Sequence, residues 1–284
     1  MSGVDGTQDP KANAPKGAGS EWIDFPLSSD TAQGDAIERT ALGEGSRLIR
    51  APRLVGNPGI TPISIEQYRR LAAVLHQAQV DRGIKSVMVA SAFSGEGKTL
   101  TAANLALTLS ESFRRRVLLI DADLRRPMLH DIFQIPNLEG LSDGLKSKAL
   151  RKMPLVEITA NLSLLPGGRP DSDPVGGLTS DRMKHVMKQA GERFDWVILD
   201  TPPIVLLPDG SLLAAMVDTS LLVVAAGRTP CAAIQRAVNA IGRERIIGTL
   251  LNFVDHTGIA PAMQAYDYQR RPYPVPNRAL EGRT

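Results

Sequence analysis

Residues 92–99 combine glycine, lysine and threonine in a pattern that suits phosphate binding. The glycines of this loop let backbone N–H groups turn toward phosphate oxygens with no Cβ in the way. Lys98 supplies a positive charge for the β- and γ-phosphates, and the Thr99 hydroxyl is placed to ligate Mg²⁺. The sequence therefore predicts a nucleoside triphosphate site. The loop residues expected to contact the nucleotide are Ser94, Gly95, Glu96, Gly97, Lys98, Thr99 and Leu100.

The loop departs from the strict phosphate-binding pattern at Ala92, where a glycine is usual six residues before the lysine. An ordinary glycine loop is the alternative to a nucleotide site. An apolar run at 87–90 precedes the loop, and a helical segment follows at 100–109. Because the motif is credible only between a strand and a helix, this context favours nucleotide binding.

Carboxylates follow two further apolar runs. One run leads into Asp121, Asp123 and Arg125, and the other leads into Asp200. Ligands bind at the carboxyl ends of strands in open parallel sheets, and an acid at that point can hold Mg²⁺ directly or through water. Acids that only end strands at a solvated edge are the alternative. Three strands that all end in phosphate or metal chemistry favour one shared site.

The elements that must position these residues alternate along the chain. Strands are expected at 87–90, 117–120, 162–165, 196–199, 221–225 and 247–253. Helices are expected at 65–80, 100–109, 180–191, 210–216 and 230–241, with a turn and a short helix at 140–145. Ser64 and Gln67 have the spacing of a capping box for the first helix. The alternation predicts an α/β fold, a largely parallel sheet with helices on both faces.

The chain of 284 residues is 43% hydrophobic and 22% charged, enough for one α/β core plus tails. Residues 1–61 are rich in glycine, proline, serine and alanine without sustained periodicity, which predicts a mostly disordered arm. Within it, Trp22, Ile23 and Phe25 form either a short docking segment or loop contacts with the domain surface. The domain is expected over 62–256, followed by a flexible tail at 257–284.

Cys231 is the single cysteine, so an internal disulfide is excluded, and its place in a helical segment predicts a small buried side chain. No apolar run reaches the roughly 20 residues needed to span a bilayer, and the first 30 residues lack a signal-like region. We therefore expect a cytoplasmic protein that reaches the inner membrane through a partner. The net charge of +3 is dispersed except at 114–116, so no nucleic-acid partner is expected.

The motifs resemble those of the bacterial tyrosine kinases of capsule and exopolysaccharide synthesis. These kinases are a branch of the deviant P-loop ATPases, which also include chromosome-partitioning and division-site proteins. The resemblance covers roughly residues 62–256 and implies a P-loop NTPase fold. It rests on the segments 94–99, 119–127, 140–143 and 199–203, and on Asp209.

The resemblance implies roles for individual residues, with ATP and Mg²⁺ as the bound groups. Asp121 and Asp123 would coordinate the metal or accept the proton of a tyrosine, and either can fill the second role. The residues implied to be catalytic are Lys98, Asp121, Asp123 and Arg125. Those implied to hold the metal are Thr99, Asp121 and Asp200. Asn252 matches the position that contacts the base, and the alternative is that it caps the end of a strand.

Three of the four tyrosines lie in the polar C-terminal tail. Such clustering outside any core argues against packing as their purpose. In the family resembled, a C-terminal tyrosine cluster is phosphorylated in trans. The expected phosphoacceptors are therefore Tyr266, Tyr268 and Tyr273. Chance, or a docking strip, is the alternative.

Two positions bear on assembly and on the branch of the family. Members usually carry Glu-x-x-Arg-x-x-Arg before the first strand; Glu66 and Arg69 are in place here, but Ala72 replaces the second arginine. Because that motif is associated with ring assembly, the homo-oligomer implied by phosphorylation in trans is left open. Phe93 stands where partitioning ATPases carry a signature lysine, which favours the kinase branch.

The leading hypothesis is an ATP- and Mg²⁺-dependent protein tyrosine autokinase that regulates capsular or exopolysaccharide biosynthesis and export. A separate transmembrane polysaccharide co-polymerase would be its activating partner. One alternative is a kinase-inactive, nucleotide-gated regulatory ATPase that docks on the export machinery. The other is a partitioning ATPase on DNA or membrane, which Phe93 and the dispersed charge disfavour.

Overall fold

A computed structural model of the protein describes residues 53–147 and 153–254. Its centre is a seven-stranded sheet with the order β3-β4-β2-β5-β1-β6-β7. The strands are β1 (Ser86–Ser91), β2 (Val117–Asp121), β3 (Val156–Thr159), β4 (Leu162–Leu165), β5 (Trp196–Asp200), β6 (Thr219–Ala225) and β7 (Ile246–Asn252). Every neighbouring pair is parallel except β3 and β4. The predicted largely parallel α/β sheet is confirmed.

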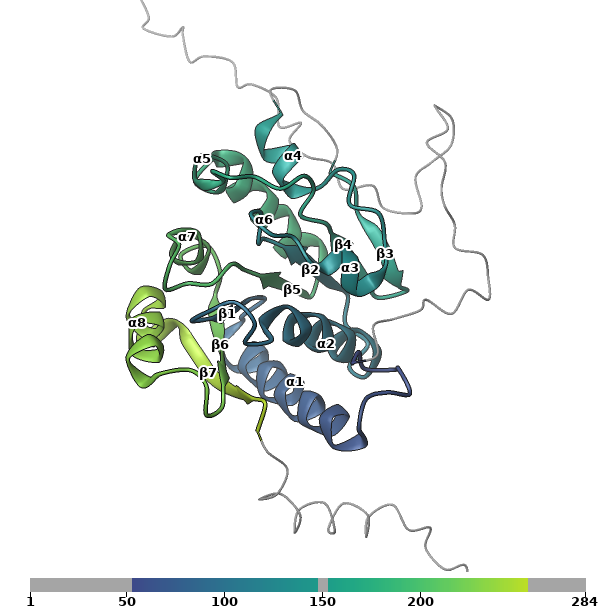
Figure 1. The fold of residues 1–284 in the computed structure, drawn as a ribbon. Coiled ribbons are helices and arrows are strands. Elements are labelled where there is room, and N and C mark those ends of the chain that lie inside the picture. The colour runs from purple at the N-terminus through teal and green to yellow at the C-terminus, as the bar shows by residue number, and fades with distance from the viewer. Residues whose placement is uncertain (1–52, 148–152, 255–284) are drawn as a thin grey trace, which may run out of the picture.

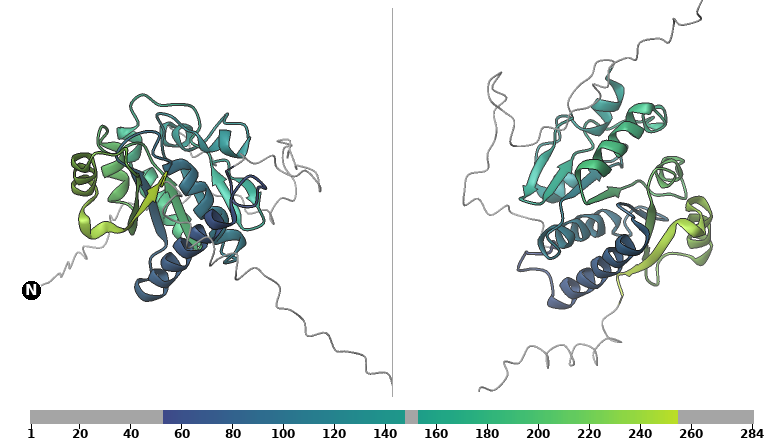
Figure 2. Two further views of the ribbon diagram at one scale, coloured as in Figure 1. Left: turned by 60° about the horizontal axis from the view of Figure 1, so that its bottom comes forward. Right: turned by 180° about the vertical axis from the view of Figure 1, so that it is seen from behind.

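Helices cover both faces of this sheet (Figures 1 and 2). They are α1 (Pro62–Arg82), α2 (Lys98–Glu111), α3 (Leu129–Phe133), α4 (Leu141–Lys146), α5 (Val175–Leu178), α6 (Asp181–Arg193), α7 (Asp209–Ala214) and α8 (Cys231–Ile241), with a 3-10 turn at Arg243–Arg245. Side chains of α1, α2 and α3 form one core with one face of the sheet, and those of α4 to α8 form a second core with the other face.

The central strands alternate between these two cores. In β1, Val87 and Val89 belong to the core under α2, whereas Met88 and Ala90 belong to the core under α6 and α7. Strands β1, β2, β5 and β6 are almost wholly buried, which is why each reads in the sequence as a continuous apolar run and not as an alternating one. The apolar runs therefore located these strands within one to two residues.

The register of the sheet places the acidic residues side by side. Asp121, the last residue of β2, is paired with Asp200, the last residue of β5. Asp200 is in turn paired with Val89 of β1, two residues before the end of that strand. The carboxyl ends of three neighbouring strands therefore meet at one edge, where the phosphate-binding loop begins.

The first helix begins earlier than expected. Its N-cap is Thr61, whose hydroxyl accepts a hydrogen bond from the Ser64 N–H at 3.2 Å, and Pro62 occupies the first turn. Upstream of it, the Val55 N–H donates to Asn104 Oδ1 of α2 at 2.7 Å, and Leu54 is fully buried. The folded region therefore begins before residue 62; residues 1–52, like 257–284, lie outside the described residues.

Other differences have local causes. Strand β3 was not expected, since its residues are only half buried and it pairs antiparallel at the sheet edge with a bulge. The short helices α3 and α5 were not expected either. Cys231 is exposed, so the prediction of a buried thiol is wrong: it is the first residue of α8 and lies off the buried stripe of Ala233, Ala237 and Ile241.

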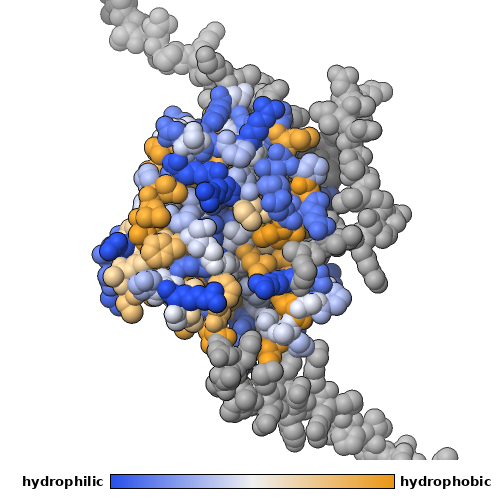
Figure 3. Space-filling view, viewed as in Figure 1, coloured by the Kyte–Doolittle hydropathy of each residue, from blue (hydrophilic) through white to orange (hydrophobic). Residues whose placement is uncertain are grey.

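The surface mixes polar and apolar side chains. On the face shown in Figure 3, groups of hydrophilic residues lie between smaller groups of hydrophobic ones. Among the helices of residues 53–147 and 153–254, none has the length and apolar character needed to cross a membrane.

Candidate active site

The loop after β1 turns into α2 through two glycines in the left-handed region, Gly95 with φ +84° and Gly97 with φ +93°. Gly97 is the N-cap of α2, so Lys98 and Thr99 are the first residues of that helix. A Cβ on Gly97 would lie 2.1 Å from Asn252 Nδ2. Glycine is therefore required at this position both by its backbone conformation and by the asparagine packed over it.

The Glu96 side chain points into the protein. Its Oε2 accepts the Phe93 N–H at 2.8 Å, and its Oε1 accepts the hydroxyl of Thr229. Thr229 lies between β6 and α8, and its hydroxyl also accepts the Ala225 N–H at 3.1 Å. The carboxylate of Glu96 thus fixes the shape of the loop, which leaves the backbone N–H of residue 96 for the expected nucleotide contact. Nothing in the local sequence pattern pointed to Thr229.

Lys98 lies among acidic groups. Its Nζ is 3.3 Å from Asp123 Oδ2, 3.8 Å from Asp200 Oδ1 and 3.3 Å from the Thr99 hydroxyl. Burial lowers the pKa of Lys98, but Asp200 and Asp123 outweigh it, so the pKa is raised and the ammonium stays charged. The structure therefore brings Lys98 together with Asp123 and Asp200, which the sequence predicts after two different strands.

Asp121 and Asp200 are both fully buried. Burial raises the pKa of Asp121, and the neighbouring charge of Asp200 raises it further. Burial also raises the pKa of Asp200, although Lys98 and the Thr99 side chain oppose that change. Two carboxyl groups at one sheet edge with a single buried cation favour retention of a proton between them.

Several oxygen atoms of this cluster lack hydrogen bonds. Both carboxylate oxygens of Asp200, and Oδ1 of Asp121, are buried without a hydrogen-bond partner among the described residues. Such atoms are costly in a folded protein unless a ligand satisfies them. With the Thr99 hydroxyl beside Asp200, they form an oxygen donor set that suits Mg²⁺.

The described residues contain no group of three or more His, Cys, Asp or Glu side chains arranged as metal ligands. A phosphate-bound Mg²⁺ does not need one, because it is held by one or two protein oxygens, by phosphate oxygens and by water. The donor set of Thr99 and Asp200 therefore fits the ion.

Asp121 and Asp123 are held in different ways. Asp121 Oδ2 accepts the N–H groups of Met128 and Leu129 at the start of α3, each at 2.9 Å. Asp123 Oδ1 accepts the Arg126 N–H at 3.1 Å, and its Oδ2 contacts Lys98. One oxygen of Asp121 is therefore committed to the backbone of α3, whereas Asp123 presents an oxygen to the loop cation.

Arg125 is turned toward a different partner. Its Nε is 2.6 Å from Asp209 Oδ2 and its second terminal nitrogen is 3.2 Å from Asp209 Oδ1, a bidentate pair. It also donates to the carbonyl of Ser172. Asp209 is fully buried at the start of α7. Arg125 is therefore paired with an acid of α7 and not with the aspartates around Lys98. Its expected catalytic role stays a prediction.

Asn252 lies against the phosphate-binding loop. Its Nδ2 donates to the Glu96 carbonyl at 3.0 Å, while its Oδ1 accepts the Phe253 N–H at 2.9 Å. The side chain therefore caps the end of β7 and also contacts the loop, whereas its contact with a base stays a prediction. Arg228 lies over the Phe253 ring at 4.9 Å from its centroid. The expected phosphoacceptors Tyr266, Tyr268 and Tyr273 lie outside the described residues.

Comparisons with known proteins show which family the chain resembles. The family described as the CobQ/CobB/MinD/ParA nucleotide binding domain matches residues 87–277. Tyrosine-protein kinase YwqD of Bacillus subtilis (strain 168) is 36% identical over 211 residues, which cover 73% of this chain and 88% of that protein. Tyrosine-protein kinase wzc of Salmonella typhi is 33% identical over 221 residues, 77% of this chain but only 30% of that protein.

Among solved structures, the kinase domain of the Escherichia coli tyrosine kinase ETK is similar, with a TM-score of 0.63 and 30% identity. The match covers 67% of this chain and 75% of that domain. The chain spans most of YwqD and less than a third of wzc.

Proposed function

Because the chain belongs to the bacterial tyrosine kinases within the CobQ/CobB/MinD/ParA nucleotide-binding family, we propose that it is an ATP- and Mg²⁺-dependent protein tyrosine autokinase. One observation carries the proposal: at the end of a phosphate-binding loop, Lys98 forms ion pairs with Asp123 and Asp200, beside buried carboxylate oxygens that accept no hydrogen bond. This arrangement combines a phosphate cradle, a cation and proton acceptors within one edge of the sheet.

The proposed reaction is transfer of the γ-phosphoryl group of ATP to a tyrosine. The bond between the γ-phosphorus and the β–γ bridging oxygen breaks as the tyrosine oxygen forms its bond to phosphorus. ADP leaves, and the tyrosine proton passes to a carboxylate. Lys98 supports this step by neutralising charge on the transferring group, because phosphoryl transfer depends mainly on positioning and electrostatic stabilisation.

Thr99 and Asp200 would hold Mg²⁺. When bound, the ion would neutralise the charge of the β- and γ-phosphate oxygens. Asp121 is the third candidate ligand, through its unpartnered Oδ1.

We assign the proton acceptor role to Asp123. Its Oδ2 is 3.3 Å from Lys98, and its side chain keeps 8% exposure, whereas Asp121 is fully buried and holds the start of α3. Asp123→Asn should lower kcat at least about 100-fold while nucleotide affinity stays within a few-fold. Asp121→Asn is the matched variant; an equal loss of kcat with unchanged metal affinity in both variants would contradict the assignment.

The autokinase is tested by incubating the full chain with ATP and Mg²⁺, with and without the cytoplasmic segment of a candidate membrane partner. Phosphate is then mapped by mass spectrometry beside a Lys98→Met control. The expected result is phosphate on Tyr266, Tyr268 or Tyr273 that is absent in the control. Bound nucleotide without any tail phosphate, with the partner present, would overturn the proposal.

The biological role we propose is regulation of capsular or exopolysaccharide biosynthesis and export, through a transmembrane polysaccharide co-polymerase. The resemblance of the motifs to kinases of that pathway supports it. Loss of surface polysaccharide on deletion, restored by the wild-type chain but not by Lys98→Met, is the expected result. Restoration by both would show that nucleotide chemistry is not what the pathway needs.

One observation favours a second candidate function, a nucleotide-gated module that docks on the export machinery without kinase activity. Ala72 is fully buried in the core beneath α1, where the family motif has its second arginine. The Glu66 and Arg69 pair remains, at 3.7 Å. Without the second arginine, contacts between copies would weaken. Partner affinity measured by calorimetry with ATP and with ADP tests this candidate, and equal affinities would contradict it.

A further inference from the structure

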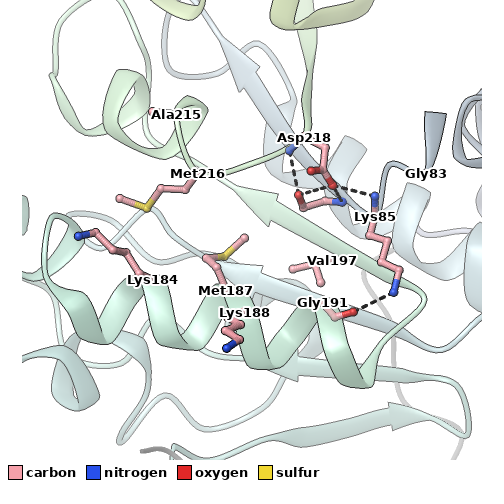
Figure 4. A pocket seen from close by; sticks show the side chains of 11 residues that line it. Gly83, Lys85, Lys184, Met187, Lys188, Gly191, Val197, Ala215, Met216 and Asp218 are labelled. Atoms are coloured by element: carbon pink, nitrogen blue, oxygen red, sulfur yellow. Dashed lines mark hydrogen bonds between the residues drawn. The ribbon is translucent and has the colours of Figure 1, made fainter.

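A hollow lies at the opposite edge of the sheet from Lys98. It is a pocket of about 710 Å³ between α6, the start of β1 and the connection from α7 to β6 (Figure 4). Strands β1, β5 and β6 begin here, whereas the phosphate-binding loop lies where β1 ends. Its volume falls within the roughly 300–1,000 Å³ of typical ligand pockets.

The inner walls of the pocket are apolar and adaptable. Met187 of α6, Met216 of the α7–β6 connection and Val197 of β5 line it. Methionine side chains are flexible and polarizable, so they accommodate irregular apolar partners, aromatic rings above all. The pocket therefore suits a large apolar side chain more than a small polar metabolite.

The rim of the pocket is basic. Lys85, Lys184 and Lys188 contribute three positive charges, against one lining acid, Asp218. Asp218 Oδ2 already accepts hydrogen bonds from the N–H groups of Lys85 and Ser86, each at 2.8 Å, and from the Ser86 hydroxyl at 2.9 Å. One of its two carboxylate oxygens is thus engaged within the protein.

Two of the rim lysines make polar contacts within the protein. The Lys85 ammonium donates to the Gly191 carbonyl at 3.1 Å, a neutral acceptor (Figure 4). Lys184 pairs with the solvent-exposed Asp181 at 2.9 Å. With Asp181 and Asp218 counted against the three lysines, the rim keeps one net positive charge, which favours an acidic partner.

We propose that the occupant is this chain's own segment 21–25, with the sequence Glu-Trp-Ile-Asp-Phe. It combines two carboxylates with three large apolar side chains, which is the complement of a methionine-lined pocket with a lysine rim. Trp22 is one of only two tryptophans in the chain. The surrounding residues 1–52 are otherwise rich in small and polar types, so this segment concentrates the apolar side chains of that region.

The tether is long enough for docking within one chain. The 27 residues at 26–52 can span up to roughly 90 Å. A folded domain of about 200 residues is roughly 45 Å across. A tethered segment also binds at a high effective concentration, so a weak site suffices.

The test places the photo-cross-linker benzoylphenylalanine at position 22 of the full-length chain. Benzophenones react readily with methionine side chains, so cross-links from position 22 to Met187 or Met216 of the same molecule are expected. The matched control carries the cross-linker at position 42 of the same arm and should not label these methionines. Peptide mapping by mass spectrometry identifies the products.

A charge reversal tests the lysine rim. Lys184→Glu combined with Lys188→Glu should lower the yield of the position-22 product at least about fivefold, since two attractions become repulsions. Both lysines lie on the partly exposed face of α6, and circular dichroism confirms that the variant is folded. Hydrogen exchange of residues 184–191 gives a second readout, because Trp22→Ala should accelerate it.

Three results would overturn the proposal: products at position 22 that match those at position 42, products on another surface, or products that form only between two copies of the chain. An unchanged yield in the folded charge-reversal variant, together with unchanged exchange in Trp22→Ala, would have the same force. None of these readouts depends on kinase activity, so they test this proposal independently of the proposed function.

Discussion

At the carboxyl ends of β2 and β5, three buried aspartates surround Lys98, whereas at the amino end of β1 the exposed Asp218 accepts three hydrogen bonds from its neighbours. The residue type is the same, but only the first group has buried carboxylate oxygens that accept no hydrogen bond. A fold does not retain buried unsatisfied oxygens for stability, since each is costly. The contrast supports the proposal that the aspartates around Lys98 serve a ligand, whereas Asp218 stabilises the start of the sheet.

The largest expected difference is between substitutions of one residue at each edge of the sheet, Lys98 and Asp218. Lys98→Met should lower tyrosine phosphorylation at least about 100-fold, because no other described cation contacts Asp123 and Asp200. Asp218→Ala should leave the rate per folded molecule nearly unchanged. It should instead lower the free energy of unfolding by about 1–2 kcal/mol, since two N–H groups and a hydroxyl lose their acceptor.

Initial rates with labelled ATP and urea unfolding curves measure the two quantities. Asp218→Asn is the control, because its side-chain oxygen can still accept from the two N–H groups. The contrast between the edges breaks down if Asp218→Ala lowers the rate as strongly as Lys98→Met does.

The next effect concerns pH. Because the pKa of Asp121 is raised in the folded protein, the folded state binds more protons than the unfolded chain above the ordinary carboxyl pKa of about 4. The stabilisation is therefore present in acid and is lost as the pH rises through the raised pKa. Asp121→Asn should reduce this loss and make the nucleotide-free protein at least about 1 kcal/mol more stable at high pH, the equivalent of one pKa unit.

Thermal unfolding of both proteins across the pH range, without nucleotide or Mg²⁺, measures this slope. Equal slopes for the wild type and Asp121→Asn would show that Asp121 does not hold the proton.

The smallest expected effect comes from Thr229, whose hydroxyl is hydrogen-bonded beside the phosphate-binding loop. Thr229→Val removes the hydroxyl that donates to Glu96 and should loosen the phosphate-binding loop. A hydrogen bond to a carboxylate contributes about 1.5 kcal/mol or more to the folded loop. Only part of this reaches nucleotide binding, so the KM for ATP should rise roughly fivefold while kcat is kept. Thr229→Ser retains the hydroxyl and should behave as the wild type. A loss of kcat alone in Thr229→Val would place Thr229 in the chemistry itself.

The part of the fold that the sequence predicts well is the part whose signals are local. Each strand that delivers a site residue is a continuous apolar run followed directly by its motif. The sequence therefore predicts Lys98 in the loop after β1, and Asp121 and Asp200 at the ends of β2 and β5. The pairing of Asp121 with Asp200 then follows from the parallel order of the strands.

The rest depends on contacts between distant segments. Arg125 and Asp209 are 84 positions apart, and Thr229 is 133 positions from Glu96. No periodicity or motif connects such pairs, because each residue is chosen by the space that the folded chain leaves for it. The exposure of Cys231 and the edge strand β3 were missed for a related reason, since both depend on which face of an element meets the core.

The amide of Asn252 contacts the carbonyl of Glu96 across 156 positions of sequence. A ribosome that adds about 5–20 residues per second needs roughly 8–30 seconds to cover that distance. Throughout this interval the nascent chain carries the complete glycine–lysine–threonine motif but lacks the side chain that packs over Gly97. The phosphate-binding loop reaches its final form only after the last strand of the sheet has been synthesised and has docked.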